Sequence, residues 1–479
     1  NRCQVVQMVE TEQIENVVLG GGEAGKYVAW TLAQEGQEVL VVERELIGGA
    51  CPNTACLPSK NVIRTAEVAD LVRRAADYGI ATEPVSVDMG GVRERKREMV
   101  AGMVDIHERR FATPGIEFLL AEGRLVGPRT VEARLADGST RRVRAERLFL
   151  NLGTRASVPS ISGMDAAQPL THVEALELGE LPEHLLVLGG GYVGVEFAQA
   201  FRRLGSRVTL LEQGPQLLGR EDPDVAEAVE QLFEEDGIEV MLGTETLAVE
   251  GRSGESVRLR VKTGAGDDTV EGTHLLVATG RTPNTSGIGL EAAGIELDER
   301  GYVKVDPKLR TTAPGVWAMG ECAGSPQFTH VAFDDFRVVR DDLAGDNGSR
   351  STEGRLVPYC AFIDPQLARV GLDEGTAERE GVSVRVARIP MAQVLRARAI
   401  GETRGFMKML IAQESDQILG FTMLGADAGE VLAVVQVAML GGLPYTALRD
   451  AILTHPTMAE GLTVLLADVP ERGSSARPS

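Results

Sequence analysis

The chain has few cysteines for its length. Five occur in 479 residues, too few and too unevenly spaced for the disulfide framework of a small secreted domain. No apolar run approaches the 18 residues that suggest a membrane-spanning helix. The amino-terminal segment also lacks the apolar core of a signal peptide. We therefore expect a globular protein of the cytoplasm.

Positive charge is also scarce. Lysine and arginine total 49 against 70 aspartates and glutamates, and the formal net charge is −21. A polyanion would be repelled by such a surface, so nucleic acid and anionic membranes are excluded as partners. The length is too great for one hydrophobic core and predicts about three domains.

A glycine-rich turn follows the apolar segment Val17–Leu19. Gly20, Gly22 and Gly25 have the G-x-G-x-x-G spacing, which serves a tight turn, a close approach to pyrophosphate and helix packing. The following helix would direct its N–H groups and positive dipole end at the phosphates. A second apolar strand ends at Glu43, where a carboxylate can accept hydrogen bonds from ribose hydroxyls. Strand, turn, helix, strand and acid in this order predict a dinucleotide site.

The same pattern occurs a second time. Gly189, Gly191 and Gly194 follow the apolar segment Leu185–Leu188, and Glu212 lies at the offset that separates Glu43 from Gly20. The repeat indicates either two working sites or a domain duplicated for structural reasons. Because both copies keep the glycines and the acid, we favour two bound dinucleotides.

Cys51 and Cys56 lie within Gly48–Lys60, soon after the first glycine motif. A Cys-x4-Cys spacing alone is compatible with two structural thiols or half of a metal site. Here a cofactor bound at the first motif could reach the pair. A hydride cannot pass directly from a nicotinamide to a disulfide, whereas a flavin can convert one form of electron transfer into the other. Two nucleotide sites beside a cysteine pair therefore favour a flavin-linked redox disulfide.

Residues 48–60 resemble the redox-active segment of the FAD-dependent pyridine nucleotide–disulfide oxidoreductases, the family of glutathione reductase, dihydrolipoamide dehydrogenase, mercuric reductase and the reactive-chlorine-resistance reductases. The resemblance covers nearly the whole chain. It implies an α/β fold with two Rossmann-like dinucleotide-binding domains, for FAD and NAD(P), and a C-terminal α+β dimerisation domain. The domains implied are 1–154 (first part of the FAD domain), 155–282 (NAD(P)), 283–345 (second part of the FAD or central domain), 346–466 (dimerisation) and 467–479 (disordered tail). Residues 341–354 are predicted to be a linker.

The resemblance also implies roles for the cysteines. Cys56 would be the flavin-proximal thiol that forms a charge-transfer pair, and Cys51 the thiol that attacks the substrate. Since the thiolate is the attacking species, an activating base is expected. His455, in a His-Pro-x-x-x-Glu pattern, is the candidate, and Glu460 would orient its imidazole. In the family this histidine reaches the disulfide of the other subunit, which implies a homodimer.

Lys60 and Glu196 resemble a buried pair that the family places near flavin N5. A solvated lysine and a surface glutamate are the alternative. The resulting catalytic candidates are Cys51, Cys56, Lys60, Glu196, His455 and Glu460, and no metal ligands are expected. The FAD candidates are Gly20, Gly22, Gly25, Glu43, Lys60, Gly153 and Glu321, the last standing where the family usually has Asp. The NAD(P) candidates are Gly189, Gly191, Gly194, Glu212, Gly280 and Arg281.

The acid after the second motif bears on coenzyme choice. Glu212 can accept from a ribose 2′-hydroxyl and would repel a 2′-phosphate, so NADH is preferred over NADPH. Arg202, Arg203 and Arg207 lie nearby in the sequence and could offset this preference.

The substrate remains open between a disulfide and a soft metal ion such as Hg(II) or Cu(II). Mercuric reductases end in a vicinal cysteine pair, whereas no cysteine follows Cys360 here. Residues 333–341 are similar to those of the reactive-chlorine-resistance reductases. Oxidation of a dithiol such as dihydrolipoamide with NAD is the second enzymatic hypothesis. A flavin-bound redox sensor without turnover is the non-enzymatic one.

Overall fold

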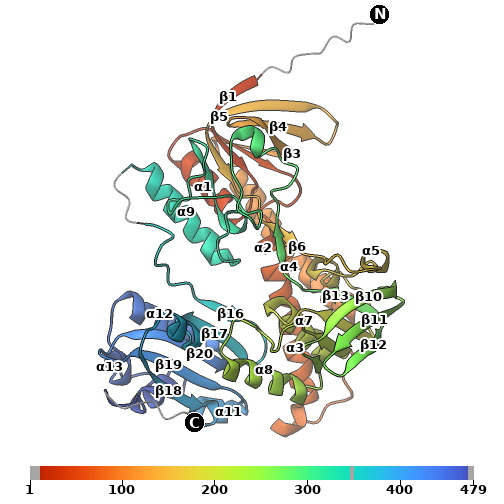
Figure 1. The fold of residues 1–479 in the computed structure, drawn as a ribbon, viewed down its shortest axis with the longest axis vertical. Helices are drawn as coiled ribbons and strands as arrows, with labels where there is room; N and C mark the ends of the chain where they lie inside the picture. Colours follow the sequence, from red (N-terminus) through yellow and green to blue (C-terminus); the bar gives the residue numbers. More distant parts are fainter. Residues whose placement is uncertain (1–10, 346–349, 473–479) are drawn as a thin grey trace, which may run out of the picture. The chain divides into compact units, whose positions relative to one another are not determined.

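The computed structural model describes residues 11–345 and 350–472, which form two compact units. The first unit draws on segments 1–61, 91–157 and 281–355, and the second on 62–90, 158–280 and 356–479 (Figure 1). None of the described helices is both long and apolar enough to span a membrane. The five domain boundaries expected from the sequence stay a prediction, and most of the predicted tail, residues 473–479, lies outside the described residues.

The first unit is built on a parallel sheet. Its strands lie in the order β3 (Ile116–Gly127), β2 (Val39–Glu43), β1 (Thr11–Leu19), β5 (Thr140–Leu150) and β15 (Val316–Ala318). β4 (Thr130–Leu135) pairs antiparallel with β3 and β5. A parallel sheet in this strand order is the architecture of nucleotide-binding α/β domains. It carries the carboxyl ends of β1, β2 and β5 to one edge, where the first glycine motif lies.

Alternate residues of these strands face two different layers. Val18 and Phe149 pack with α1 (Glu23–Gln34), α4 (Met89–Phe111) and α9 (Thr329–Leu343). Val17 and Leu148 point the other way, toward a core that includes Leu290, Ile295 and Val303. Side chains alternate along a strand, so covering both faces requires apolar residues at every position. This explains the apolar runs Val17–Leu19 at the end of β1 and Val39–Val42 in β2.

Shorter elements complete the first unit around the sheet edge. They are α2 (Ala50–Asn53), the start of α3 (Cys56–Arg73), β6 (Thr154–Ala156), β14 (Arg281–Pro283) and the 3₁₀ turn η3 (Gly320–Ala323). The predicted linker at 341–354 begins too early, because α9 continues to Leu343. Asp342 in its last turn accepts hydrogen bonds from Trp317 Nε1 at 2.9 Å and Arg310 Nε at 2.8 Å. These contacts hold a polar stretch in helical form.

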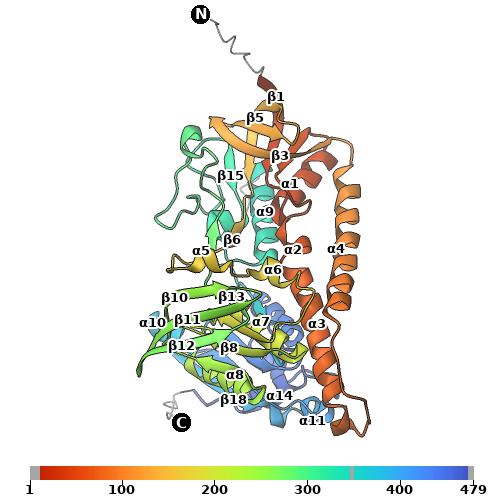
Figure 2. The same cartoon turned by 90° about the vertical axis from the view of Figure 1, so that its right-hand side faces the viewer.

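The second unit repeats the parallel architecture. β13 (His274–Val277), β7 (His184–Leu188), β8 (Arg207–Leu211) and β9 (Glu239–Met241) lie in that order, with α7 (Tyr192–Leu204) and α8 (Pro223–Glu235) between strands. An antiparallel sheet of β10 (Glu245–Arg252), β11 (Ser256–Thr263) and β12 (Gly266–Gly272) is part of the same unit (Figure 2). The duplication predicted from the two glycine motifs is therefore present in the fold.

The carboxyl-terminal part of the second unit is an antiparallel sheet. Its order is β16 (Tyr359–Ala361), β17 (Gln366–Gly371), β20 (Ile418–Gly425), β19 (Phe406–Ala412) and β18 (Val384–Pro390). Its helices are α10 (Glu374–Arg379), α11 (Leu395–Ile400), α12 (Ala428–Leu440), α13 (Tyr445–Arg449) and α14 (Gly461–Ala467). α12 packs on β17 and β20 and closes a core rich in methionine.

A buried lysine ties the carboxyl-terminal sheet of the second unit to the amino-terminal ends of α8 and α10. Lys408 of β19 is fully buried, and its Nζ lies 2.8 Å from carboxylate oxygens of Asp222, Asp224 and Glu374. Burial alone would lower the pKa of Lys408, but its hydrogen bonds to the three acids outweigh burial and raise it. These acids are clustered closely enough to ligate a metal ion, and the ammonium is the cation that they share.

Lys408→Met is expected to lower the free energy of unfolding by about 3–5 kcal/mol, because it leaves clustered carboxylates without their cation. The measurement is the denaturant midpoint of the second unit, monitored by far-UV circular dichroism. The control is Arg258→Met, which removes an exposed ion pair with Glu271 and should cost under about 1 kcal/mol. Equal denaturant midpoints for the two variants would contradict the role of Lys408 as the cation shared by the three acids.

Candidate active site

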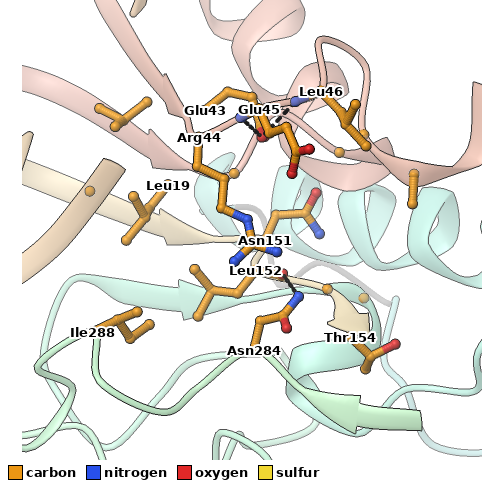
Figure 3. A pocket seen from close by; sticks show the side chains of 18 of the residues that line it. Leu19, Glu43, Arg44, Glu45, Leu46, Asn151, Leu152, Thr154, Asn284 and Ile288 are labelled. Atoms are coloured by element: carbon orange, nitrogen blue, oxygen red, sulfur yellow. Dashed lines mark hydrogen bonds between the residues drawn. The ribbon is translucent and has the colours of Figure 1, made fainter. Parts of the chain in front are cut away.

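A cavity of about 640 Å³ opens at the strand ends of the first unit. It is lined by residues from all three segments, including Gly20, Glu43, Cys51, Asn151 and Glu321. In Figure 3 the side chain of Arg44 is directed into this space, in the direction of Asn151. The cavity therefore joins the first glycine motif to the cysteine segment.

Close backbone contacts explain the glycines. Gly20 has φ +100°, and a Cβ there would lie 2.2 Å from the carbonyl oxygen of Asn151. A Cβ at Gly25 would lie 2.3 Å from the Gly20 oxygen, so the helix packs directly on the turn as predicted. A Cβ at Gly49 would lie 2.6 Å from Cα of Gly22. Glycine at position 49 thus lets the cysteine segment pack directly against the first glycine turn.

Glu43 holds the loops beside it. Its carboxylate accepts from the N–H groups of Gly21 at 2.7 Å, Glu45 at 2.9 Å and Leu46 at 3.2 Å; the last two bonds are part of the view in Figure 3. A carboxylate has about four acceptor positions, so one remains for a ribose hydroxyl. The predicted cofactor contact is compatible with this geometry.

Asn151 is a residue that the sequence analysis did not select. Its Oδ1 accepts from the Gly25 N–H at 3.0 Å, and its Nδ2 donates to the Met319 oxygen at 3.1 Å. One side chain thus joins the first glycine motif to the segment that carries Glu321. Its position directly after an apolar strand was the available signal.

Glu321 is paired within the same unit. Its Oε2 contacts the hydroxyl of Thr154 and lies 3.2 Å from Nε of Arg281, which also donates to the Thr154 hydroxyl at 2.6 Å. Arg281 was predicted to contact NAD(P), but it lines the cavity of the first unit together with Gly153. The longer side chain of Glu321, relative to Asp, is accommodated by these two partners.

The two cysteines are thiols joined by a hydrogen bond, and Cys51 lines the cavity. Cys51 lies in α2, Cys56 begins α3, and both are half-buried. The hydrogen bond from Cys51, aided by Thr329 and the charge of Lys60, lowers the pKa of Cys56 to about 6. The same hydrogen bond, together with burial, raises the pKa of Cys51. A negative charge on the reduced pair therefore resides on Cys56.

Thr329 was not predicted either. It is the first residue of α9, and its hydroxyl lies 3.2 Å from the Cys56 sulfur. The helix amino terminus and the hydroxyl both favour a negative charge at that sulfur. No motif in the sequence linked it to cysteines more than 270 positions earlier.

Thr329→Val is expected to raise the pKa of Cys56. The thiolate of the wild type should persist at neutral pH and protonate as the pH falls through about 6, whereas the variant should protonate roughly 0.5–1 pH unit higher. The thiolate–flavin absorbance of the reduced protein, titrated under anaerobic conditions, measures this. Thr65→Val, farther along α3, is the control, and coincident titrations of the two variants would contradict the assignment.

The second glycine motif reproduces the geometry of the first. Gly189 has φ +105°, and a Cβ at Gly194 would lie 1.8 Å from the Gly189 oxygen. A Cβ at Gly191 would meet no atom within 4 Å, which leaves open space where a pyrophosphate would approach. Glu212 accepts from the Gly190 N–H at 2.6 Å, the equivalent of the Glu43 contact. Gly280, with φ +119°, belongs to this unit.

The predicted base and its orienting acid are in contact. Nδ1 of His455 lies 2.9 Å from Oε1 and 3.0 Å from Oε2 of Glu460, and the imidazole is exposed. Glu196 is buried in α7 and accepts from the Phe362 N–H at 2.8 Å. It belongs to the second unit and Lys60 to the first, so their pairing stays a prediction.

Two protein-family models match the amino-acid sequence of the chain. The pyridine nucleotide-disulphide oxidoreductase model matches residues 15–335, and the dimerisation-domain model of the same family matches residues 357–465. The chain belongs to this family. The predicted fold class, with its two dinucleotide-binding domains and its dimerisation domain, is confirmed. Members of the family are FAD-dependent enzymes that use NAD(P)H and a redox-active disulfide.

Three relatives illustrate the breadth of this oxidoreductase family. The chain is 35% identical over 457 residues to the probable pyridine nucleotide-disulfide oxidoreductase RclA of Escherichia coli, covering 94% of this chain and 98% of RclA. It is 35% identical to the mercuric reductase of Streptomyces lividans, covering 93% and 94% of the two chains. It is 33% identical to the dihydrolipoyl dehydrogenase of Chlorobaculum tepidum, covering 94% and 95%.

Solved structures of related proteins have the same fold as this chain. A Cu(II) complex of the HOCl-induced flavoprotein disulfide reductase RclA from Escherichia coli superposes with a TM-score of 0.87 at 34% identity, covering 95% of this chain and 99% of that one. LpdA from Mycobacterium tuberculosis has a TM-score of 0.84 at 28% identity, with coverage of 95% and 99%. The residues of this oxidoreductase fit FAD. The glycine turn admits pyrophosphate, Glu43 retains an acceptor position, and the cavity reaches Cys51.

Proposed function

We propose that this enzyme transfers electrons from NADH through Cys51 and Cys56 to a disulfide substrate, with a soft metal ion as the second candidate. When bound, FAD supplies the conversion between two-electron transfer from the nicotinamide and reduction of the cysteine pair. The observation that carries the proposal is the asymmetry of the two thiols. Cys56 favours the thiolate at neutral pH, whereas Cys51 stays protonated.

Because Cys51 stays protonated, its reaction with a substrate requires a base. Cys51 must lose its proton before it attacks a substrate disulfide, and an exposed histidine beside a carboxylate is suited to take it. The Cys51 sulfur then bonds to one substrate sulfur, and the other leaves as a thiolate that receives the proton from His455. The Cys56 thiolate next attacks Cys51, releasing the second substrate thiolate and restoring the Cys51–Cys56 disulfide.

The histidine favours a disulfide over a metal ion. A leaving thiolate needs a proton, whereas reduction of a metal cation needs none. A metal substrate is supported by the relatives, since one is a mercuric reductase and another was solved as a Cu(II) complex. Turnover assays with glutathione disulfide, oxidised lipoamide, Hg(II) and Cu(II) separate the two candidates.

NADH as the donor is supported by the placement of three arginines. Arg202 donates to the backbone oxygen of Asp236, and Arg203 is buried against the Asp236 carboxylate. Arg207 begins β8, whereas Glu212 follows its last residue, roughly 16 Å away at the usual strand rise. None of the three is arranged to offset the repulsion between Glu212 and a 2′-phosphate.

A homodimer is supported by an exposed apolar face in the segment that matches the dimerisation domain. Val437 and Leu440, one helical turn apart on α12, are 67% and 69% exposed, and Ile452 is fully exposed three residues before His455. Burying such side chains against a second copy is favourable. Sedimentation velocity, with Leu440→Asp as the interface variant, tests whether the protein is a homodimer.

Because NADH is the proposed donor, we also propose that the enzyme is located in the cytoplasm.

The deciding experiment is anaerobic titration of the purified holoenzyme with NADH and, separately, NADPH. Long-wavelength thiolate–flavin absorbance that appears after two electrons would support Cys56 as the flavin partner. Bleaching of the flavin at two electrons without that absorbance would overturn the proposal. The coenzyme that acts at the lower concentration identifies the donor.

A further inference from the structure

A buried ionic cluster lies behind the cysteine segment. Lys26 is 5% exposed, and its Nζ lies 2.7 Å from Oε2 of Glu23 and 3.0 Å from Nε2 of His107. The ring centroids of Tyr27 and Trp30 lie 5.8 and 5.9 Å from the same nitrogen. A buried ammonium is stabilised by such partners. The proposed electron path uses none of these residues.

The hydrogen bonds define the charges in the cluster. Nδ1 of His107 lies 2.7 Å from the Met103 carbonyl oxygen, which can only accept, so Nδ1 carries the proton. Nε2 is then an acceptor for the ammonium of Lys26. Burial lowers the pKa of His107, which agrees with a neutral ring. The positive charge therefore lies on Lys26 and the negative charge on Glu23.

The cluster is connected to Cys51 in two ways. The His107 ring packs against Gly48, where a Cβ would lie 2.8 Å from Cδ2. Glu23 directly follows Gly22, whose Cα would lie 2.6 Å from a Cβ at Gly49, two residues before Cys51, and Glu23 and Cys51 line the same cavity. The charge of Glu23 contributes to the raised pKa of Cys51, so the carboxylate opposes a thiolate at that sulfur.

The groups around the two sulfurs differ in sign. Cys51 is influenced by Cys56, Thr329 and Glu23. Cys56 is influenced by the same threonine, by the cation of Lys60, and by the more weakly opposing carboxylate of Glu321. The carboxylate of Glu23 thus acts on Cys51, whereas at Cys56 the cation of Lys60 outweighs the carboxylate of Glu321.

We infer that Glu23, held in place by Lys26 and His107, is a positioning residue that directs the negative charge of the reduced cysteine pair away from Cys51 and onto Cys56. This inference rests on the proposed role of the two cysteines. Glu23 then helps to determine which of the two thiols is charged. It also helps to set the pH above which Cys51 forms a thiolate without proton transfer to His455.

The test is the pH dependence of Cys51 alkylation by iodoacetamide in the reduced holoenzyme, with Cys51 distinguished from Cys56 by fragment-ion mass spectrometry. Glu23→Gln should move the midpoint of Cys51 alkylation roughly 0.3–1 pH unit lower. Lys26→Met leaves the carboxylate uncompensated and should move it higher by a similar amount. The double variant should lie near the wild type if the two residues act as a pair.

Glu45→Gln is the matched control, since Glu45 lines the same cavity and should leave the midpoint unchanged. FAD content shows whether each variant is folded, and if Lys26→Met loses FAD, Glu23→Gln decides alone. A midpoint in Glu23→Gln equal to that of Glu45→Gln overturns the inference. A failure of the proposed function is recognised separately, because the thiolate–flavin absorbance would then be missing from the wild type and from every variant. If the wild type shows this absorbance, only the role of Glu23 is overturned.

Discussion

Cys51→Ser is expected to reduce disulfide turnover by at least about 10³-fold, because a serine hydroxyl cannot form the mixed disulfide with the substrate. Reduction of the flavin by NADH should be retained, since Cys51 acts after that step. Steady-state turnover with a disulfide substrate and stopped-flow flavin absorbance measure the two halves separately. Loss of both together would place Cys51 in cofactor binding and contradict its role as the attacking thiol.

Cys360→Ser is the matched control. Cys360 is also a half-buried thiol, but it lies in the second unit on β16 and contacts Gln366. Its replacement should leave turnover within about twofold of the wild type, in line with a substitution away from the reacting atoms. A redox sensor without turnover would show no difference between the two variants in any steady-state assay.

His455→Gln is expected to lower turnover by about 10²–10⁴-fold, the usual contribution of a positioned acid–base group. Glutamine keeps a polar side chain but cannot carry the proton between Cys51 and the leaving thiolate. The remaining activity should rise with pH, because hydroxide then replaces the base. Rates measured across pH test this, and an unchanged pH profile would contradict the role of His455.

Glu460→Gln should give a smaller loss than His455→Gln, because the histidine remains and only its orientation is weakened. Replacement of His172, which lies on a short helix outside the carboxyl-terminal sheet, is the control for an effect of histidine loss in general. Turnover of the control should match the wild type.

Mixing the two inactive variants tests where the base acts. If His455 serves the cysteine pair of a second copy, a dimer of Cys51→Ser with His455→Gln contains one complete site, and random mixing restores about a quarter of the wild-type turnover in a symmetric dimer. If it acts within its own chain, no site is complete and turnover stays near zero. Exchange of subunits can be followed by native mass spectrometry.

Local chemistry made much of the nucleotide sites predictable from sequence. A turn such as Gly20–Gly25 needs small residues where helix and strand approach closely, so the spacing of the glycines carries the geometry in itself. Glu43 ends its strand and Glu212 directly follows its own, and each accepts a hydrogen bond from the turn beside it. The contact between His455 and Glu460 spans five residues and was equally accessible.

Contacts between distant segments could not be predicted in this way. Thr329 meets Cys56 because the first turn of α9 reaches the start of α3, and Asn151 joins Gly25 to Met319 across more than 100 residues on either side. Threonine is too common to signal such a role, and the position of Asn151 after an apolar strand places it at the sheet edge without identifying its partners. The position of each is set by the packing of a sheet edge.

The sequence by itself determined the family, the cofactor class and the cysteine pair, because these depend on residues that act within one short segment. The family resemblance also named Cys56 as the flavin-proximal thiol, but only the tertiary structure decided which groups favour a thiolate there. The hydrogen bond between the two thiols acts most strongly, and Glu23, Lys60 and Thr329 add to it from three different helices that come together only when the first unit folds. The preference of Arg202, Arg203 and Arg207 for partners other than Glu212 has the same origin, because neighbours in sequence on a helix and a strand point to different surroundings.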